Sequence, residues 1–187
     1  MNLKKSITLL ATALLLGTLY SFKAVQPVYR VTESLTTFHS KAKLELIKAA
    51  SSKMQGAIDA TKRTFAFTID MNSFEGFNSP LQKEHFNENY MESRKYPRAS
   101  FTGRIIEDDD FTKDGTYNLR AKGKFTVHGV EQERIIQADI QVKNGIIQLK
   151  SQFTVHLADH EIKIPRIVHE KLAAEILIDI NATLAAK

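Results

Sequence analysis

Histidine and carboxylate side chains are the residues of this sequence that could bind a metal ion or perform acid–base chemistry. The chain has six histidines and no cysteine, so a metal site would need histidine and carboxylate ligands. His156 and His160 have the i, i+4 spacing of a helical metal pair, but an extended strand separates such residues by about 13 Å, too far to share an ion. Neither His160-Glu161 nor His169-Glu170 belongs to an HExxH pattern. We therefore predict no metal site and surface or structural roles for these histidines.

The other candidates for chemistry are an acidic run and short catalytic motifs. The run Glu107–Asp110 has adjacent carboxylates, but it lacks the interleaved spacing and the glycine of a calcium-binding loop, so we interpret it as a solvated turn. No stretch has the pattern of a nucleophile elbow, a phosphate-binding loop or a dinucleotide fingerprint. We predict no catalytic residue and a protein that is not an enzyme.

Strands must position most side chains of this protein, because apolar and polar residues alternate with period two along most of the chain. The alternation is unbroken from Phe38 to Leu46, which predicts one strand there. Asn144-Gly145 between apolar runs is a strong hairpin signal, and His128-Gly129 marks another turn. Eight or nine antiparallel strands follow from this pattern, and they can close as a barrel or pack as a sandwich. Further apolar faces are Phe65 to Met71, Leu119 to Val127, Ile136 to Val142 and Ile176 to Ala182.

One helical insertion, at about residues 79–94, interrupts the strands. Ser79-Pro80 supplies an N-cap and a proline suited to the first helical position, and Gln82 completes a capping box. The apolar residues of the insertion do not share one helical face, so we expect two short pieces, the second capped by Asn89. Tyr96-Pro97 then requires extended backbone and begins the next strand.

Four stretches together resemble the YceI-like family of periplasmic proteins, which bind polyisoprenoids and related amphiphiles in a lipocalin-like barrel. They are Ser79–Gly103, the glycine-flanked strand end Gly123–Val130, the glycine-led strand Gly56–Asp59 and the late strand Phe153–Leu157. The resemblance covers about residues 27–187. It implies an all-β fold, an antiparallel eight-stranded lipocalin-like barrel with a short helical insertion. The stretch Lys41–Leu46 is more charged than the family's second strand, which implies a divergent branch whose ligand differs.

An eight-stranded barrel either is filled by its own side chains or holds one ligand where some of those side chains are small. Small and aromatic residues mix on the predicted inner faces, and from the residues alone a filled core with twist-relieving glycines explains this as well as a cavity does. The resemblance favours the cavity. His128 at a strand end and His85 on the insertion would contact a ligand head group or pin the insertion to the strand ends. The predicted ligand-binding residues are Phe38, Leu44, Phe65, Phe67, Phe86, Phe101, Ala121, Gly123, Phe125 and His128.

The N-terminal segment predicts export to the periplasm. Lys4-Lys5 precede an apolar run from Ile7 to Leu19, which is the layout of a secretory signal and too short for a comfortable transmembrane helix. We place a signal peptide at 1–24 and a lipid-binding β-barrel domain at 27–187, with an uncleaved anchor as the alternative. Three lysines of the signal contribute to the net charge of +5, so the mature chain carries about +2, too little to indicate nucleic acid. Charged residues on the polar strand faces indicate no stable membrane insertion.

Three functions fit these observations. The first is non-catalytic binding, transport or storage of a polyisoprenoid or similar amphiphilic lipid, with a bound isoprenoid lipid or quinone as the only cofactor-like group and a homodimer as an allowed assembly. The second is a lipid-modifying enzyme in the same barrel, which would need an inner polar group with a perturbed pKa that the inner faces hardly offer. The third is a structural or stress-response exported protein with a filled core.

Overall fold

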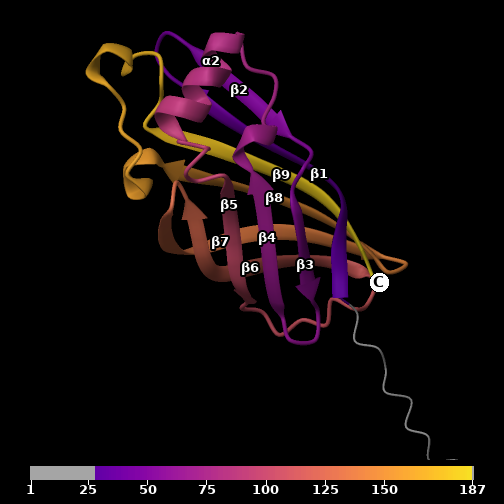
Figure 1. Ribbon diagram of the computed structural model, residues 1–187. Coiled ribbons are helices and arrows are strands. Elements are labelled where there is room, and N and C mark those ends of the chain that lie inside the picture. Colours follow the sequence, from indigo (N-terminus) through magenta and orange to yellow (C-terminus); the bar gives the residue numbers. More distant parts are fainter. Residues whose placement is uncertain (1–27, 187) are drawn as a thin grey trace, which may run out of the picture.

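The computed structural model describes residues 28–186, which form an antiparallel barrel with a helical segment over one end (Figure 1). Eight strands close the barrel through the pairing of β1 with β9, and β2 is an additional strand beside β1, so the predicted eight-stranded barrel is confirmed. The strands are β1 (Val28–Lys41), β2 (Leu46–Ser51), β3 (Gln55–Asp59), β4 (Thr64–Asp70), β5 (Arg98–Ile105), β6 (Gly115–Val127), β7 (Val130–Lys143), β8 (Ile146–His156) and β9 (Glu175–Ala186).

Strand β1 is the strand around which the barrel closes. Along one edge it pairs with β9 over most of its length. Along its other edge, its first residues pair with β3 and its last residues pair with β2. Residues 52–54 between β2 and β3 belong to no strand, so the wall of the barrel is interrupted at this point.

The prediction of one strand from Phe38 to Leu46 is wrong, because β1 ends at Lys41 and β2 begins at Leu46. The four residues between them form a turn in which the Ala42 amide donates to the Glu45 carbonyl. This turn contains no glycine, proline or asparagine that would mark it in the sequence. It is held instead by the distant Glu170, whose carbonyl accepts from the Leu44 amide at 2.8 Å.

The two predicted hairpin turns are confirmed. Asn144-Gly145 joins β7 to β8 with φ angles of 51° and 73°, and His128-Gly129 joins β6 to β7 with φ angles of 51° and 74°. Positive φ at both central residues matches the twist of antiparallel strands, and glycine adopts this conformation without steric cost. These turns fix the register of the three longest consecutive strands.

We call residues 71–97, which connect β4 to β5, the lid. The lid contains the 3₁₀ turn η1 (Met71–Ser73), the helix α2 (Pro80–His85) and the π-helical turn η2 (Phe86–Tyr90). The predicted start is confirmed, because the Ser79 hydroxyl accepts from the Gln82 amide at 3.2 Å and Pro80 is the first helical residue. The capping box is displaced by one residue, since Gln82 Oε1 accepts from the Asn78 amide. Strand β5 follows Pro97 as predicted.

The predicted second helix capped by Asn89 is wrong, because α2 continues directly into η2. The Met91 amide donates to the Phe86 carbonyl, five residues earlier, and this π turn adds one residue to the helical repeat. Phe86, Tyr90 and Met91 then line one cavity, although they do not share a face of an α-helix. The π turn therefore resolves the irregular apolar spacing that the sequence shows.

Two apolar clusters fill the barrel along its axis. The lower cluster, at the end opposite the lid, is closed by large side chains that include Phe111, Ile140, Ile147 and Leu184. The upper cluster combines strand residues with side chains of the lid and of the segment between β8 and β9. That segment contains two 3₁₀ turns, η3 (Leu157–His160) and η4 (Arg166–Val168). The cavity described next lies within the upper cluster.

Candidate ligand-binding cavity

A cavity of about 180 Å³ lies between the upper half of the barrel and the lid. It is larger than a cavity that takes up benzene, at about 150 Å³, and smaller than ordinary ligand pockets of about 300–1,000 Å³. Its wall is almost entirely apolar. It is lined by Thr36, Phe38, Ser40, Met54, Phe67, Thr68, Ile69, Met71, Phe74, Phe86, Tyr90, Met91, Ala99, Ser100, Phe101, Phe125, Val127, Phe153, Val155, Leu157, Ile162, Leu172, Ile176, Ile178 and Ile180.

Aromatic contacts close the cavity on the lid side. The ring of Phe38, from β1, stacks on Phe86 with a centroid distance of 5.3 Å and an interplanar angle of 10°. Phe74 and Phe77 of the lid pack against the same ring, with centroid distances of 5.5 and 5.9 Å. Aromatic pairs of this kind contribute about 0.5–1.5 kcal/mol each beyond their burial. The lid is thus held over the cavity by side-chain packing on one strand residue.

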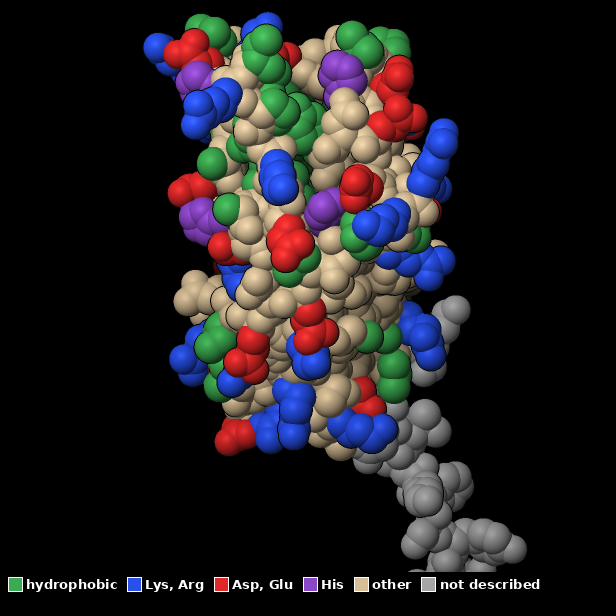
Figure 2. Space-filling view, turned by 60° about the vertical axis from the view of Figure 1, so that its left-hand side comes forward, with side chains coloured by type: hydrophobic (Ala, Val, Ile, Leu, Met, Phe, Trp, Pro, Cys, Tyr) green, Lys and Arg blue, Asp and Glu red, His purple; other side chains and the backbone are tan. Residues whose placement is uncertain are grey.

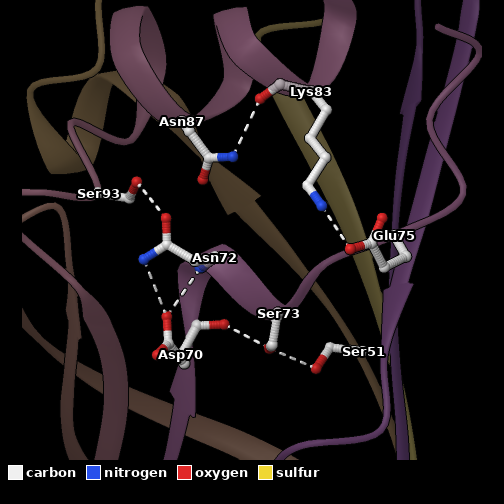
Figure 3. Close-up of polar contacts among 8 residues, drawn as sticks. All are labelled: Ser51, Asp70, Asn72, Ser73, Glu75, Lys83, Asn87 and Ser93. Carbon is white, nitrogen blue, oxygen red and sulfur yellow. Dashed lines mark hydrogen bonds and ion pairs between the residues drawn. The ribbon is translucent and has the colours of Figure 1, made fainter. Parts of the chain in front are cut away.

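Polar contacts hold the lid to the barrel at its edges (Figure 3). Near β4, the Ser93 hydroxyl donates to Asn72 Oδ1 at 2.8 Å, and the Asn72 amide donates to Asp70 Oδ1. The hydroxyls of Ser73 and Ser51 are 2.6 Å apart, which connects the lid to β2. These contacts are side-chain hydrogen bonds, each worth about 1 kcal/mol, rather than an extended backbone ladder.

A backbone connection also joins the lid to β2. Ala50 and Glu75 exchange two backbone hydrogen bonds of 2.8 and 2.9 Å as an isolated bridge. The Glu75 carboxylate also pairs with the ammonium group of Lys83, on α2. This bridge fixes the first part of the lid, and the rest is held by packing and by side-chain contacts such as that of Gln82 Nε2, which donates to Glu45 Oε1 at 2.9 Å.

The segment between β8 and β9 covers the other side of the cavity. Leu157, Ile162 and Leu172 of this segment contribute to the cavity wall. The Ala173 amide donates to the Ser40 hydroxyl at 2.9 Å, which ties the segment to β1. Figure 2 shows hydrophobic side chains gathered in a hollow near the lid end of the molecule, between raised parts that carry charged side chains.

The polar groups of the cavity are few, and the hydroxyls of Thr68 and Ser40 are engaged in internal hydrogen bonds. The Thr68 hydroxyl donates to the Ala99 carbonyl at 3.2 Å, and the Ser40 hydroxyl accepts from Ala173 as described. Tyr90 is the one titratable side chain in the lining, and burial raises the pKa of its phenol. It therefore stays neutral near pH 7, and the cavity suits an uncharged, apolar chain.

Five of the predicted ligand-binding residues line this cavity: Phe38, Phe67, Phe86, Phe101 and Phe125. Three others lie elsewhere. Leu44 is in the turn between β1 and β2 and is 63% exposed, so its predicted place on the inner face is wrong. Phe65 and Ala121 do face inward, but they pack in the lower cluster, below the cavity.

Gly123 also lies outside the cavity wall. The reason for a glycine at this position differs from the predicted one, which was space for a ligand. It pairs with Gly103 of β5, and a Cβ atom at Gly123 would lie 2.2 Å from the Thr102 carbonyl oxygen. A Cβ at Gly103 would likewise lie 2.1 Å from the Lys122 carbonyl oxygen. The two glycines therefore permit a close approach of the β5 and β6 backbones, and the space beside them is filled by protein.

The two histidines of the family-like motifs differ in their contacts. His128 is outside the cavity lining and joins three segments: Nδ1 is 3.0 Å from the His160 carbonyl, Nε2 is 3.2 Å from a Glu92 carboxylate oxygen, and Tyr96 packs on the ring edge. This arrangement fits the alternative in which His128 pins the lid to the strand ends. His85 is exposed at the end of α2.

His160 is fully buried beside the cavity wall, with its ring against Phe125 at a centroid distance of 5.5 Å. Its Nδ1 donates to the Val130 carbonyl at 3.1 Å, and within residues 28–186 its buried Nε2 has no partner. Burial lowers the pKa of the imidazole, so it is held neutral. His156, four residues earlier, is instead exposed and pairs with Glu175.

The acidic run of the sequence is divided among separate partners. Glu107 Oε1 accepts from Arg120 Nε at 2.7 Å. Asp108 pairs with Arg63, and Asp110 accepts from the Thr112 amide. Across residues 28–186, no group of three histidine or carboxylate side chains is arranged as metal ligands would be.

Sequence reasoning missed the cavity residues that lie outside alternating strands. Phe74 follows a 3₁₀ turn and has no periodic signal, and Met54 lies in the link between β2 and β3. Phe153 and Val155 are different, since they alternate along β8 and the same period-two pattern predicts their inward orientation.

The closed barrel with an apolar cavity beneath a lid defines a small single-domain protein of the lipocalin-like class. A family model described as the YceI-like domain matches residues 27–184. The chain therefore belongs to the YceI-like family, as the resemblance indicated.

Solved structures share the fold at low sequence identity. A polyisoprenoid binding domain from Saccharophagus degradans, implicated in plant cell wall breakdown, has a TM-score of 0.71 and 17% identity over 85% of this chain and 98% of that one. BcnA of Burkholderia cenocepacia has a TM-score of 0.67 and 16% identity, covering 80% and 95%. The YceI protein of Campylobacter jejuni has a TM-score of 0.56 and 15% identity, covering 72% and 81%. No curated protein matches the chain significantly.

Among residues 28–186, no helix has the length and apolar character that a membrane crossing requires. The predicted signal peptide at 1–24 lies outside the described residues.

Proposed function

We propose that this protein binds a polyisoprenoid or a similar amphiphilic lipid, with the apolar chain in the cavity beneath the lid. The observation that carries this proposal is the cavity itself, which is lined by aromatic and aliphatic side chains and in which the hydroxyls of Ser40 and Thr68 are already engaged. Membership of the YceI-like family and the fold shared with a polyisoprenoid binding domain support the same ligand class. A quinone with an isoprenoid tail belongs to this class.

The size of the cavity sets a condition on this binding. At about 180 Å³ it accepts only a short part of a polyprenyl chain, so a longer chain requires the lid to move away from the barrel. The packing of Phe77 and Phe86 on Phe38 can be separated while the Ala50–Glu75 bridge still holds the first part of the lid. We propose that the lid opens in this way during loading.

We further propose that the protein carries or stores the lipid in the periplasm without changing it. The single titratable group of the lining, Tyr90, is held neutral, which supports binding over a lipid-modifying reaction. The cavity also favours binding over a structural role with a filled core. Export follows from the predicted signal, and N-terminal sequencing of the mature protein should place the cleavage between Ser21 and Gln26.

The test is organic extraction of protein purified without detergent, followed by mass spectrometry. We expect a co-purified isoprenoid lipid in an amount comparable to that of the protein. Delipidated protein should take up geranylgeraniol again. Protein that carries no lipid and does not bind geranylgeraniol would contradict the proposed function.

A further inference from the structure

A second pocket, polar and about 230 Å³ in volume, lies on the outside of the barrel wall. It is formed by residues from the link between β2 and β3, from β3, β4 and β5, and from the first turn of the lid. Two cations, Lys53 and Arg98, face it together with one carboxylate, that of Asp70. The remaining lining residues are Gln55, Thr68, Ile69 and Ser73.

The charges of this pocket favour an anion. Among residues 28–186 neither the Lys53 ammonium nor the Arg98 guanidinium takes part in an ion pair, although Arg98 is directly opposite Asp70 in the β4–β5 ladder. One oxygen of Asp70 already accepts from the backbone and side-chain amides of Asn72. The pocket therefore has a net charge of +1 and two free cationic donors, which suits a phosphate group.

The polar pocket and the apolar cavity share a wall. Thr68 and Ile69 of β4 line both spaces. Across the interruption in the barrel, Met54 lines the cavity while its neighbour Lys53 lines the polar pocket. The two spaces therefore meet where β4 faces the link between β2 and β3.

This wall has no backbone ladder. The β3–β4 ladder ends at the pair Gln55–Thr68, and Ile69 pairs only with β5 on its other edge. The next connection toward the lid is the hydrogen bond between the hydroxyls of Ser51 and Ser73, drawn in Figure 3. We call the space between these two connections the side window. The side chain of Met54, which is flexible and unbranched, lies at this window.

We propose that the polar pocket binds the phosphate group of a prenyl phosphate whose apolar chain passes through the side window into the cavity. This inference rests on the proposed function and names its ligand class more closely. The cavity offers no free cationic donor to a charged head group, whereas the polar pocket offers two within a short reach of the cavity wall. The polar pocket should therefore make a prenyl phosphate bind more tightly than the corresponding prenyl alcohol.

The experiment compares three probes by isothermal titration in buffer of low ionic strength: geranylgeranyl phosphate, geranylgeraniol and inorganic phosphate. We expect the wild type to bind geranylgeranyl phosphate about tenfold or more tightly than geranylgeraniol, since charge-assisted hydrogen bonds are stronger than neutral ones. Lys53→Gln and Arg98→Gln should each reduce this preference and leave the affinity for geranylgeraniol unchanged. Added salt should also weaken the preference.

Arg104→Gln is the matched control, because Arg104 is exposed on the same strand and the same outward face as Arg98 but is outside the pocket. It should bind all three probes as the wild type does, and the unfolding midpoints of all variants should agree. Equal binding of geranylgeranyl phosphate and geranylgeraniol by the wild type, or a preference that survives both substitutions, would overturn the inference and leave the proposed function intact. Failure of both prenyl compounds to bind would overturn both. If inorganic phosphate binds as tightly as geranylgeranyl phosphate, the pocket is an anion site unrelated to the lipid, and the inference is wrong.

Discussion

Filling the cavity from the barrel side should separate ligand binding from folding. Ala99 of β5 is buried, lines the cavity and lies opposite Ile69, so a larger side chain there points toward the proposed lipid chain. Ala99→Leu adds three carbon atoms, and burial of roughly 0.8 kcal/mol per methylene gives a gain of up to about 2 kcal/mol where a void receives them. We expect the unfolding free energy to stay equal or to rise, and the bound lipid to decrease. Urea unfolding and lipid extraction measure the two quantities.

Ala121→Leu is the control for this experiment. Ala121 also faces the barrel interior, but it packs in the lower cluster between Ile105 and Ile136. Overpacking there should cost about 1–3 kcal/mol without affecting the cavity. The reasoning is refuted if Ala99→Leu destabilises the protein as much as Ala121→Leu does, because no void would then exist. A stable Ala99→Leu protein with an unchanged lipid content would show that the chain does not use this wall.

Three further predictions concern stability. Ser79→Ala should lower the unfolding free energy by about 1 kcal/mol through the lost N-cap of α2, and an unchanged urea midpoint would contradict the capping role. Gly123→Ala should cost about 3 kcal/mol or more, because its Cβ would collide with the Thr102 carbonyl; a thermal midpoint equal to that of the wild type would show that the strands can separate there. Burial lowers the pKa of His160, so the unfolded chain takes up a proton first as the pH falls through about 6.5, and stability should decrease below that pH by at most about 1.4 kcal/mol per pH unit. His160→Phe should remove the contribution of His160 to the slope of unfolding free energy against pH between pH 7 and 5.5. An identical slope in both proteins would contradict the assignment of this pH dependence to His160.

Alternation predicted the strands and much of the inner surface, because period two is a local property of each strand, whereas the barrel was implied by the resemblance to the YceI-like family. Phe67, Phe101 and Phe125 line the cavity as the alternation indicates. The pattern failed at Leu44, where the chain turns without any local turn residue and is held by Glu170. Alternation cannot report a contact with a residue so far along the chain.

Gly123 illustrates a second limit of the pattern. Alternation places it on the inner face, but the approach of β6 to β5 is set by the pairing of two glycines and by the geometry of the whole barrel. The lid illustrates a third limit of the alternating pattern. Phe74 lines the cavity and Phe77 packs on the ring of Phe38, and both lie in the irregular segment after a 3₁₀ turn, where no period relates sequence to direction.

The aromatic residues at the base of the cavity set the depth of the space available to a lipid chain. Phe67 and Phe101 form the part of the cavity wall nearest the lower cluster, and Phe65 supports Phe101 from below with a centroid distance of 4.8 Å. If the proposed lipid chain extends along the barrel axis, these rings would therefore limit how deep it reaches, whether it enters beneath the lid or through the side window. Smaller side chains at Phe67 and Phe101 would accordingly leave room for a longer chain within the same barrel. Under the proposed function, selectivity for chain length and control of entry would thus reside in different parts of the molecule, and each could change without the other.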